Sequence, residues 1–175
     1  VQGLGDYVFY HCSGLQTAAL SKKLSEIPDN TFTGCSSLTS IGIPDSVTKI
    51  GKAAFGECSS LGSFTIPDSV REIGDGAFNK CTGLVSVTLS NQLKAIPDYA
   101  FSLCISLSSL TVPGSVASIG ESAFAFCTSL ESVTLQEGLL SIGETAFRNC
   151  GLLSTIKFPS SVTSVGDQAF ADCGT

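Results

Sequence analysis

The sequence predicts a repeat solenoid built from short parallel strands, and three observations support this prediction. All eight cysteines of the 175-residue chain stand at every twenty-third position from Cys12 to Cys173, without an insertion or deletion. A phenylalanine stands three residues before each cysteine, and a leucine stands three residues after each of the first seven. Beyond the leucine, apolar residues alternate with small polar residues, a pattern typical of a short strand with one buried face. A fixed period of this size indicates units that stack on one another.

The repeat also sets the domain organisation. About 7.6 repeats fill residues 1–175, and no linker interrupts them, so we expect a single elongated solenoid. Val1 already occupies a mid-repeat position, equivalent to Val70, and Thr175 follows the last cysteine by two residues. Solenoids normally close their ends with atypical capping repeats, and neither end has such a sequence. We therefore expect the chain to be a fragment of a longer protein or to have trimmed ends.

The first element of each repeat is a short strand. In the repeat that begins at Cys58, this strand is expected over residues 63–66, with Phe64 and Ile66 pointing inward. The segment 67–69, Pro-Asp-Ser, then ends the strand. Proline supplies no N–H to a ladder, and Asp and Ser side chains form hydrogen bonds with nearby backbone groups.

A second extended segment is expected on the opposite side of each repeat. It carries two inward residues, Val70 and Ile73 in the same repeat, and ends at Gly74. An acidic residue follows, here Asp75, and we expect it to cap a one-turn helix that leads into Phe78.

The cysteine column is expected to be a ladder of buried, reduced thiols. Equivalent residues of stacked strands lie about 4.8 Å apart with parallel side chains, whereas a disulfide needs Cβ atoms about 3.8 Å apart that face each other. A straight ladder also does not converge on one point, as four zinc ligands must. Disulfides remain the alternative. The phenylalanine column is expected to form a stack of rings in the core.

The repeat unit resembles a known family. The pattern Leu-x-x-Val-x-Leu/Ile-Pro-Asp-Ser-Val-x-x-Ile-Gly-x-x-Ala-Phe-x-x-Cys, best seen in residues 61–81, is similar to the BspA-like leucine-rich repeats of bacterial and protist surface proteins. The resemblance covers the whole chain. It implies a right-handed leucine-rich-repeat superhelix of short parallel strands, with short strands and helical turns on the opposite face.

The same resemblance implies a non-enzymatic adhesion role, on the cell surface or in a secreted protein, with binding to host matrix or cell-surface proteins. The motif residues that match are buried ones, so no binding residue can be transferred from the family. The alternative is an intracellular interaction scaffold or a structural spacer. A signal peptide encoded upstream would favour the adhesin.

Composition argues against several other classes. The net charge is -6, and the nine basic residues are scattered apart from the pair Lys22 and Lys23, which does not favour nucleic-acid binding. No segment approaches the roughly 18 apolar residues of a membrane-spanning helix, so we expect no membrane insertion. The lone His11 has no second histidine beside it, and the chain has no glycine-rich phosphate loop. The sequence predicts no catalytic, metal or cofactor residues.

The outward positions of the first strand are the main candidate site. Leucine-rich repeats usually recognise proteins through this concave face, which is wide, rigid and ordered. The candidate protein-binding residues are Ser40, Ser63, Thr65, Ser86, Thr88, Ser109, Thr111, Ser132, Thr134 and Lys157. The face contains no Trp or Tyr and only one charge, so it lacks the anchors of a high-affinity interface. The alternative interpretation is a solvated sheet face with no partner.

A second candidate is a contact patch of Tyr99, Leu103, Ile105 and Phe126. Leu103 and Phe126 directly precede a cysteine, where other repeats have glycine or a polar residue, and Ile105 stands where Ser or Thr is usual. Exposed apolar clusters mark interfaces. The alternative is that these side chains pack locally.

Acidic residues follow the Ile-Gly or Ile-Pro step in almost every repeat. They are Asp6, Asp29, Asp75, Asp98, Glu121, Glu144 and Asp167, and Lys52 interrupts the column. Turn capping explains these residues, and a bound divalent cation that relieves their mutual repulsion is the alternative.

Overall fold

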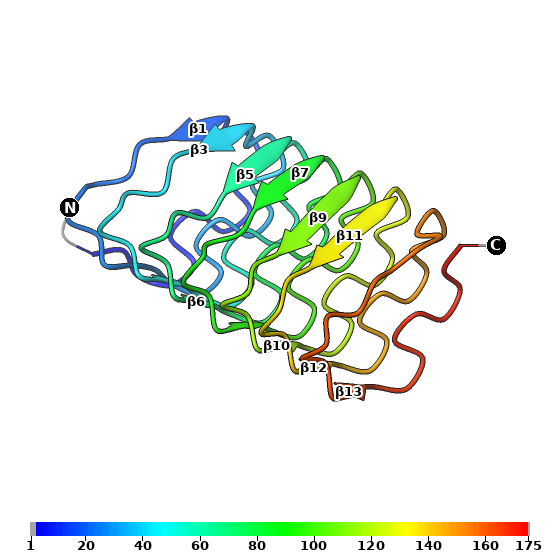
Figure 1. Ribbon diagram of the computed structural model, residues 1–175. Helices are drawn as coiled ribbons and strands as arrows, with labels where there is room; N and C mark the ends of the chain where they lie inside the picture. The colour runs from blue at the N-terminus through cyan, green and yellow to red at the C-terminus, as the bar shows by residue number, and fades with distance from the viewer. Residues whose placement is uncertain (1–2, 175) are drawn as a thin grey trace.

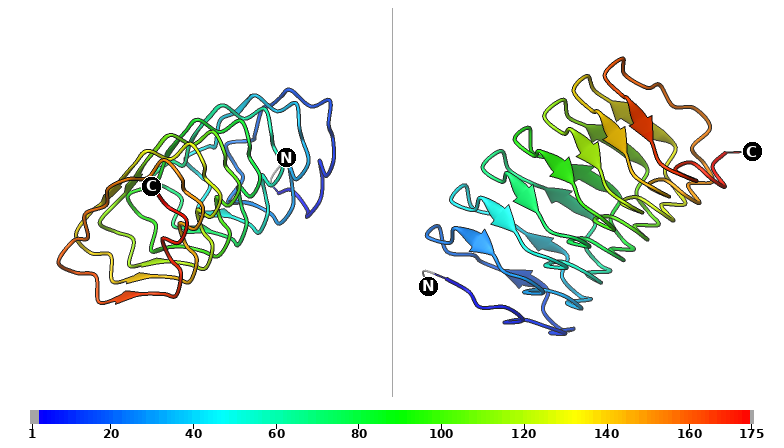
Figure 2. Two further views of the ribbon diagram at one scale, coloured as in Figure 1. Left: turned by 90° about the vertical axis from the view of Figure 1, so that its right-hand side faces the viewer. Right: turned by 90° about the horizontal axis from the view of Figure 1, so that it is seen from below.

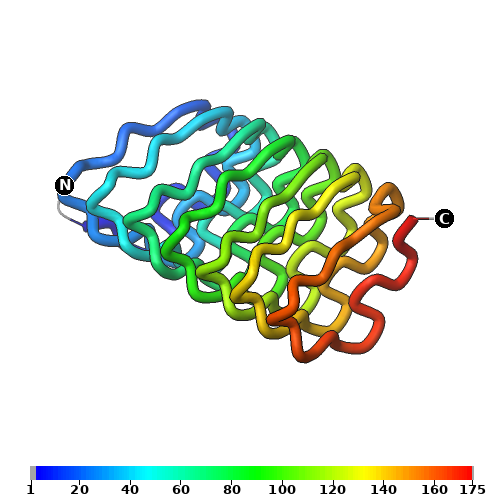
Figure 3. The backbone as a smooth tube through the Cα atoms, viewed as in Figure 1, coloured from blue at the N-terminus to red at the C-terminus, as the bar shows by residue number. Residues whose placement is uncertain are grey.

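The computed structural model describes residues 3–174 as one array of stacked repeats, with the two ends of the chain at opposite ends of the array (Figure 1). Val1 and Thr175, on which the expectation of cut ends was based, lie outside the described residues. The backbone tube shows that successive repeats follow nearly the same path, each displaced along one axis (Figure 3). The predicted solenoid of parallel strands is confirmed.

The strands of successive repeats form two columns. The first column consists of β1 (Thr17–Ala18), β3 (Ser40–Ile41), β5 (Ser63–Thr65), β7 (Ser86–Thr88), β9 (Ser109–Val112) and β11 (Ser132–Leu135). The second consists of β2 (Glu26–Ile27), β4 (Lys49–Ile50), β6 (Glu72–Ile73), β8 (Ala95–Ile96), β10 (Ser118–Ile119), β12 (Ser141–Ile142) and β13 (Ser164–Val165). The two columns lie on opposite sides of the array (Figure 2).

The strands pair in parallel with a register that equals the sequence period. Ser63 lies opposite Ser86 and Thr65 opposite Thr88 in β5 and β7, and Ser132 lies opposite Ser109 in β11 and β9. A partner exactly one repeat away keeps every side chain on the same face as its equivalent, because side chains alternate with a period of two along a strand. Columns of like residues in the sequence are therefore columns in space.

One expected strand is absent. Residues 155–157 are not hydrogen-bonded as a strand, although Thr155 and Lys157 border the same surface depression as β11. Within the described chain, no first-column strand follows this segment, so it could pair along one edge only.

The phenylalanine column forms the predicted stack at the centre of the core. Rings from Phe9 to Phe170 lie in seven successive nearly parallel pairs, with centroids 5.1–5.3 Å apart and interplanar angles of at most 9°. Phe64 adds an edge-on contact to Phe78 at 4.8 Å. Ring pairs add stabilisation beyond burial, and each ring is shared by two neighbours, which couples the repeats.

The cysteines are free thiols, and the six from Cys35 to Cys150 are buried. From Cys35 onward, each S–H donates to the carbonyl of the phenylalanine 26 residues earlier, at 3.0–3.3 Å. Burial raises the pKa of the Cys81 and Cys127 thiols to about 12. The predicted column of buried cysteines is confirmed from Cys35 to Cys150, and from Cys35 onward each thiol is hydrogen-bonded to the previous repeat. Cys12, in the first repeat, is exposed.

The side between the two strand columns does not form the expected helical turn. Residues 3–174 contain no helix, because the backbone N–H groups in this segment alternate between two destinations. The N–H of Phe101 donates to Ala123 O in the next repeat at 2.8 Å, whereas the N–H of Cys104 donates to Phe101 O in its own turn at 3.2 Å. A helix would direct both bonds within the segment.

Two residues of each such turn adopt the left-handed conformation. The non-glycine residues at these positions are Tyr7, His11, Asn30, Ala53, Glu57, Lys80, Tyr99, Leu103, Ser122, Phe126, Thr145, Asn149, Gln168 and Asp172, with φ between 48° and 62°. Gly34 and Gly76 occupy the remaining equivalent places, with φ of 74° and 60°. Only Gly, and to a lesser degree Asn and Asp, adopts this conformation without appreciable cost.

Acidic residues of the column do cap backbone N–H groups, but not those of their own turn. Asp29 Oδ1 accepts from Lys52 N, and Asp98 Oδ1 accepts from Glu121 N, both at 2.7 Å. The bond therefore crosses to the next repeat. A Cβ at Gly120 would collide with this arrangement, because it would lie against Asp98 Oδ1 and 2.7 Å from Asp98 N. The Gly in the Ile-Gly step is required here by close approach.

Candidate interaction surfaces

The ten predicted residues of the first strand column form one surface, which we call the strand face. All ten side chains are exposed, whereas the intervening residues Phe64, Leu110 and Val133 are buried. Nine of the ten lie in β3, β5, β7, β9 and β11, and Lys157 lies in the unpaired segment that follows. Their orientation agrees with the expectation from alternation, and their role in binding stays a prediction.

The strand face is regular and chemically uniform. Thr65, Thr88, Thr111 and Thr134 form one column of hydroxyls, and the serines two residues earlier form another. Each hydroxyl can donate one hydrogen bond and accept two. Because neighbouring strands are held about 4.8 Å apart, the groups form a regular grid that can bond a polar backbone lying across several repeats.

The face is bordered by side chains that the sequence analysis did not select. Asp68 Oδ1 accepts from Asn91 N at 2.7 Å, and Gln136 Oε1 accepts from Gly114 N at 2.9 Å, each across one repeat. A shallow depression lies between strands β7 and β9 and is lined on this border by Asn91 and Gln136. The signal was present in the sequence, because these residues occupy the turn positions after the first strand.

Glu137 makes several of these border contacts at once. Its carboxylate accepts from the backbone N–H groups of Ser160 at 2.9 Å and Ser161 at 3.2 Å, and also from the Ser160 hydroxyl. These hydrogen bonds lower the pKa of Glu137 because they stabilise its charged form. The loops beside the strand face are therefore tied from repeat to repeat.

The second candidate, which we call the turn-edge patch, consists of Tyr99, Leu103, Ile105 and Phe126. Tyr99, Ile105 and Phe126 are 41–43% exposed, and Leu103 is half-buried. Leu103 N donates to Ala125 O at 2.8 Å, which places Leu103 and Phe126 at equivalent points of adjacent repeats. The structure thus brings the predicted residues to one edge, and their function as a contact site stays a prediction.

Ion pairs flank the turn-edge patch on both sides along the array. Lys80 Nζ lies 3.0 Å from Glu57 Oε1 on the N-terminal side, and Arg148 Nε lies 3.5 Å from Asp172 Oδ2 on the C-terminal side. Within the patch, the Tyr99 hydroxyl donates to Glu121 Oε1 at 2.5 Å, and this bond raises the pKa of Tyr99. An apolar centre with a polar border is the usual anatomy of a protein interface.

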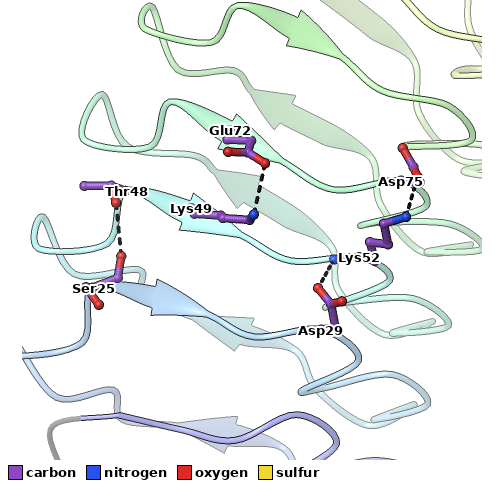
Figure 4. A network of polar contacts seen from close by, with 7 residues as sticks. All are labelled: Ser25, Asp29, Thr48, Lys49, Lys52, Glu72 and Asp75. Carbon is purple, nitrogen blue, oxygen red and sulfur yellow. Dashed lines mark hydrogen bonds and ion pairs between the residues drawn. The ribbon is translucent and has the colours of Figure 1, made fainter.

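Charges are arranged differently in the N-terminal repeats, where basic residues compensate the acidic ones (Figure 4). Lys49 pairs with Glu72 and Lys52 pairs with Asp75, both at 3.0 Å. The backbone N–H of Lys52 is also bonded by Asp29. Lys52, the one basic residue in the acidic column, thus bridges its two acidic neighbours.

Further apolar side chains are exposed near the two ends of the described array. Tyr7 and Tyr10 contact each other edge-on at 5.3 Å in the first repeat, and Phe158 and Val165 lie in the last. These residues have a neighbouring repeat on one side only.

Residues 3–174 contain no cluster of three or more His, Cys, Asp or Glu side chains that could hold a metal ion. This applies also to the acidic column, where a cation was the alternative to capping. The same residues include no helix of the length and apolar character needed to cross a membrane.

Comparison with known proteins places the repeat in a family. The family model described as "BspA type Leucine rich repeat region" matches in six copies over residues 1–81 and 48–175. None of the curated proteins compared with the chain matches it.

Solved structures share the fold. A leucine-rich repeat protein from Eubacterium ventriosum is 28% identical with a TM-score of 0.86, covering 91% of this chain and 43% of its own. The T. pallidum leucine-rich repeat protein is 31% identical with a TM-score of 0.82, covering 86% of this chain and 70% of its own. The pneumococcal vaccine antigen PcpA is 19% identical with a TM-score of 0.55, covering 86% and 58%, and shares the fold alone.

Proposed function

The chain belongs to the BspA-type leucine-rich repeat family, and from this we propose that it is a non-enzymatic protein-binding module of a cell-surface or secreted adhesin. Its partner is a matrix or cell-surface protein, and it binds to the strand face. The chain spans 43% of the length of the Eubacterium ventriosum protein, so the proposal concerns this segment and not a whole protein.

One observation supports the strand face above all: nine of its ten side chains are exposed together on parallel strands whose register equals the repeat. Rigid repeats with small side chains lose little conformational entropy on binding, since Ser and Thr have few rotamers to fix. Binding to this face therefore costs little side-chain conformational entropy. Hydroxyl columns then favour a partner that presents backbone or other polar groups across several repeats.

The face also limits the affinity. It contains no Trp, Tyr or Arg, which dominate binding energy at most interfaces. A specific complex of ordinary size buries about 800 Å² on each partner. We therefore expect a partner that contacts several strands at once, with affinity spread over many weak contacts.

The test is binding of the fragment to a panel of matrix and cell-surface proteins, compared with the double variant Thr88→Lys/Thr134→Lys. Both threonine side chains are exposed, so a lysine at either position can extend into solvent without entering the core. The two sites lie two repeats apart, which avoids repulsion between the new charges. The variant should lose saturable binding because each lysine extends over the neighbouring hydroxyls.

The matched control is Ala95→Lys/Ser141→Lys, which adds the same charge with the same spacing on the second strand column. Lys49 is the natural precedent there. The control should bind like the parent. Equal loss in both variants would show that binding follows charge and not the strand face. Saturable binding by neither the parent nor the control to any panel member would contradict the adhesin and favour the spacer.

A further inference from the structure

We propose that the turn-edge patch is a second binding site, independent of the strand face, for a basic segment of a partner protein that carries Lys or Arg together with aliphatic or aromatic side chains. The apolar side chains of the segment contact Leu103, Ile105 and Phe126. Its cations face the acidic column, which meets the patch where Glu121 accepts a hydrogen bond from the Tyr99 hydroxyl.

The first argument comes from backbone conformation. Leu103 and Phe126 both have φ of 62°, in a column whose other members are glycine or polar: His11, Gly34, Glu57, Lys80, Asn149 and Asp172. Large apolar residues are unfavourable in this conformation. They are not recruited by the core, because Phe126 is 43% exposed and Leu103 is only half-buried. The left-handed conformation is common to all eight turns, so these two residues differ from their equivalents in being apolar while the core does not bury them, which is expected at functional sites.

The second argument is the arrangement of the apolar groups. Leu103 and Phe126 are neighbours in adjacent repeats, joined through the hydrogen bond from Leu103 N to Ala125 O. Ile105 follows Leu103 by two residues, on the other side of the buried Cys104. Tyr99 occupies the earlier left-handed position of the same turn as Leu103. The four side chains therefore come from two adjacent turns on one edge, and ion pairs occupy the turns before and after them.

The third argument is charge, and it defines the partner. Asp98, Glu121, Glu144 and Asp167 follow one another in four successive repeats, and none is in an ion pair within residues 3–174. Residues 95–175 contain seven acidic and two basic side chains, a net charge of -5. Residues 1–94 contain eight acidic and seven basic side chains, a net charge of -1.

Unpaired carboxylates favour Lys and Arg on the partner and repel acidic segments. Arginine fits the patch for an additional reason, since its guanidinium group stacks on exposed aromatic rings, and Tyr99 and Phe126 supply two of them. The N-terminal repeats offer no such combination, because Lys52 interrupts the acidic column and pairs with Asp75. The positions equivalent to Leu103 and Phe126 are there occupied by His11, Gly34, Glu57 and Lys80.

The test uses a fluorescently labelled synthetic peptide in which Arg and Lys alternate with Leu and Phe, measured by fluorescence anisotropy. Two further peptides separate the contributions: one has Glu at the basic positions, and one has Ser at the apolar positions. The parent fragment should bind the first peptide, with an affinity that falls as salt is raised, and should bind the other two at least about tenfold more weakly.

The decisive variant is Leu103→Asn/Phe126→Asn. Asparagine tolerates the left-handed conformation, as Asn149 does in the same column, and the net charge of the protein is unchanged. Affinity for the first peptide should fall about tenfold or more, and circular dichroism should show an intact fold. The variant Asp98→Asn/Glu121→Gln removes two negative charges but keeps oxygen acceptors for the backbone N–H of residue 121 and for the Tyr99 hydroxyl. Because the charge is lost, both the affinity for the first peptide and its dependence on salt should fall.

The strand-face variant Thr88→Lys/Thr134→Lys should bind the first peptide within about twofold of the control Ala95→Lys/Ser141→Lys, which separates failure of this proposal from failure of the proposed function. Equal binding by the parent and the double asparagine variant would overturn the proposal. So would equal binding of the first peptide and the peptide with Ser at its apolar positions, because attraction would then come from the net charge alone.

Discussion

The strand face and the turn edge use the same repeat in opposite ways. On the strand face, each residue suits its backbone: Ser and Thr stand at exposed positions of short strands, and the columns vary little from repeat to repeat. On the turn edge, two residues of every repeat adopt the left-handed conformation, and their identities range from Gly and Asn to Tyr, Leu and Phe.

This difference indicates which surface of a repeat protein carries the residues that distinguish one repeat from another. On the strand face, Ser and Thr suit both the strand conformation and exposure to water. Such a uniform face can bind a partner only through contacts that extend over several repeats. On the turn edge the left-handed conformation recurs in every repeat while the residues vary, so the specific information lies in the few exposed apolar residues, Leu103 and Phe126 among them, that the core does not require. Paired substitutions, one on each side of this contrast, test it.

The largest expected contrast is between a core phenylalanine and an edge phenylalanine. Phe101→Ala should lower the free energy of unfolding by about 3–5 kcal/mol, because it removes a fully buried ring from the stack between Phe78 and Phe124 and leaves a cavity. Phe126→Ala, the same change on an exposed ring, should cost less than about 1 kcal/mol. Urea unfolding of both variants measures this, and equal losses would show that Phe126 is a core residue.

The next contrast concerns two glycines. Gly120→Ala should destabilise by about 1–3 kcal/mol, because the new Cβ would lie 2.7 Å from Asp98 N and displace the cap on Glu121. Gly62→Ala, beside the strand face, meets no atom within 4 Å and should stabilise by about 0.4–1 kcal/mol through the unfolded chain. Thermal unfolding distinguishes them by sign.

A third experiment probes the thiol that directly follows Phe126. Burial raises the pKa of Cys127 to about 12, above the unfolded value of about 8.5. Its contribution to stability is therefore intact below the unfolded pKa and is lost as the pH rises toward 12. Between about pH 7.5 and pH 9.5, it should account for a loss of about 1.4 kcal/mol.

Urea unfolding at the two pH values measures this loss, and Cys127→Ala should reduce the difference between them by that amount. Alkylation provides the control, since the exposed Cys12 should react in the native protein while Cys127 does not. Rapid native labelling of Cys127 would mean that the turn edge opens readily.

The smallest expected contrast comes from the substitution of alanine by glycine at two positions, where it should change stability in opposite directions. Ala53→Gly should stabilise by about 0.5 kcal/mol, because residue 53 has φ of 48° and the equivalent residue of the next repeat is already Gly76. Ala19→Gly, whose equivalent is Gly42, should destabilise by about 0.5–1 kcal/mol through chain entropy. If both variants shifted in the same direction, backbone strain would not distinguish the two surfaces.

Much of the architecture could be predicted from the sequence. A constant period without gaps places equivalent residues side by side, so the ring stack from Phe9 to Phe170, the buried thiols and the exposure of the Ser and Thr columns all follow. The reason is that, with a constant register, each residue lies beside the equivalent residues of the repeat before it and the repeat after it.

The turn could not be predicted in the same way. An acidic residue ahead of Ala-Phe indicated a helix cap, because capping rules consider hydrogen bonds within one segment. The actual bonds from Asp29 and Asp98 cross to the next repeat, as does the bond from Phe101 N. Likewise the segment 155–157 has the sequence of a strand but lacks the pairing of one.

The sequence by itself therefore determined the period, the register and the side of the array on which each column lies, since these depend only on spacing and on the alternation of polar and apolar residues. The tertiary structure alone decided the conformation of the turns. There, a backbone N–H can donate either to a carbonyl of its own repeat or to one of the adjacent repeat. The second acceptor exists only when the neighbouring repeat is stacked beside it. For the same reason, the strain at Leu103 and Phe126 became visible only in the folded array.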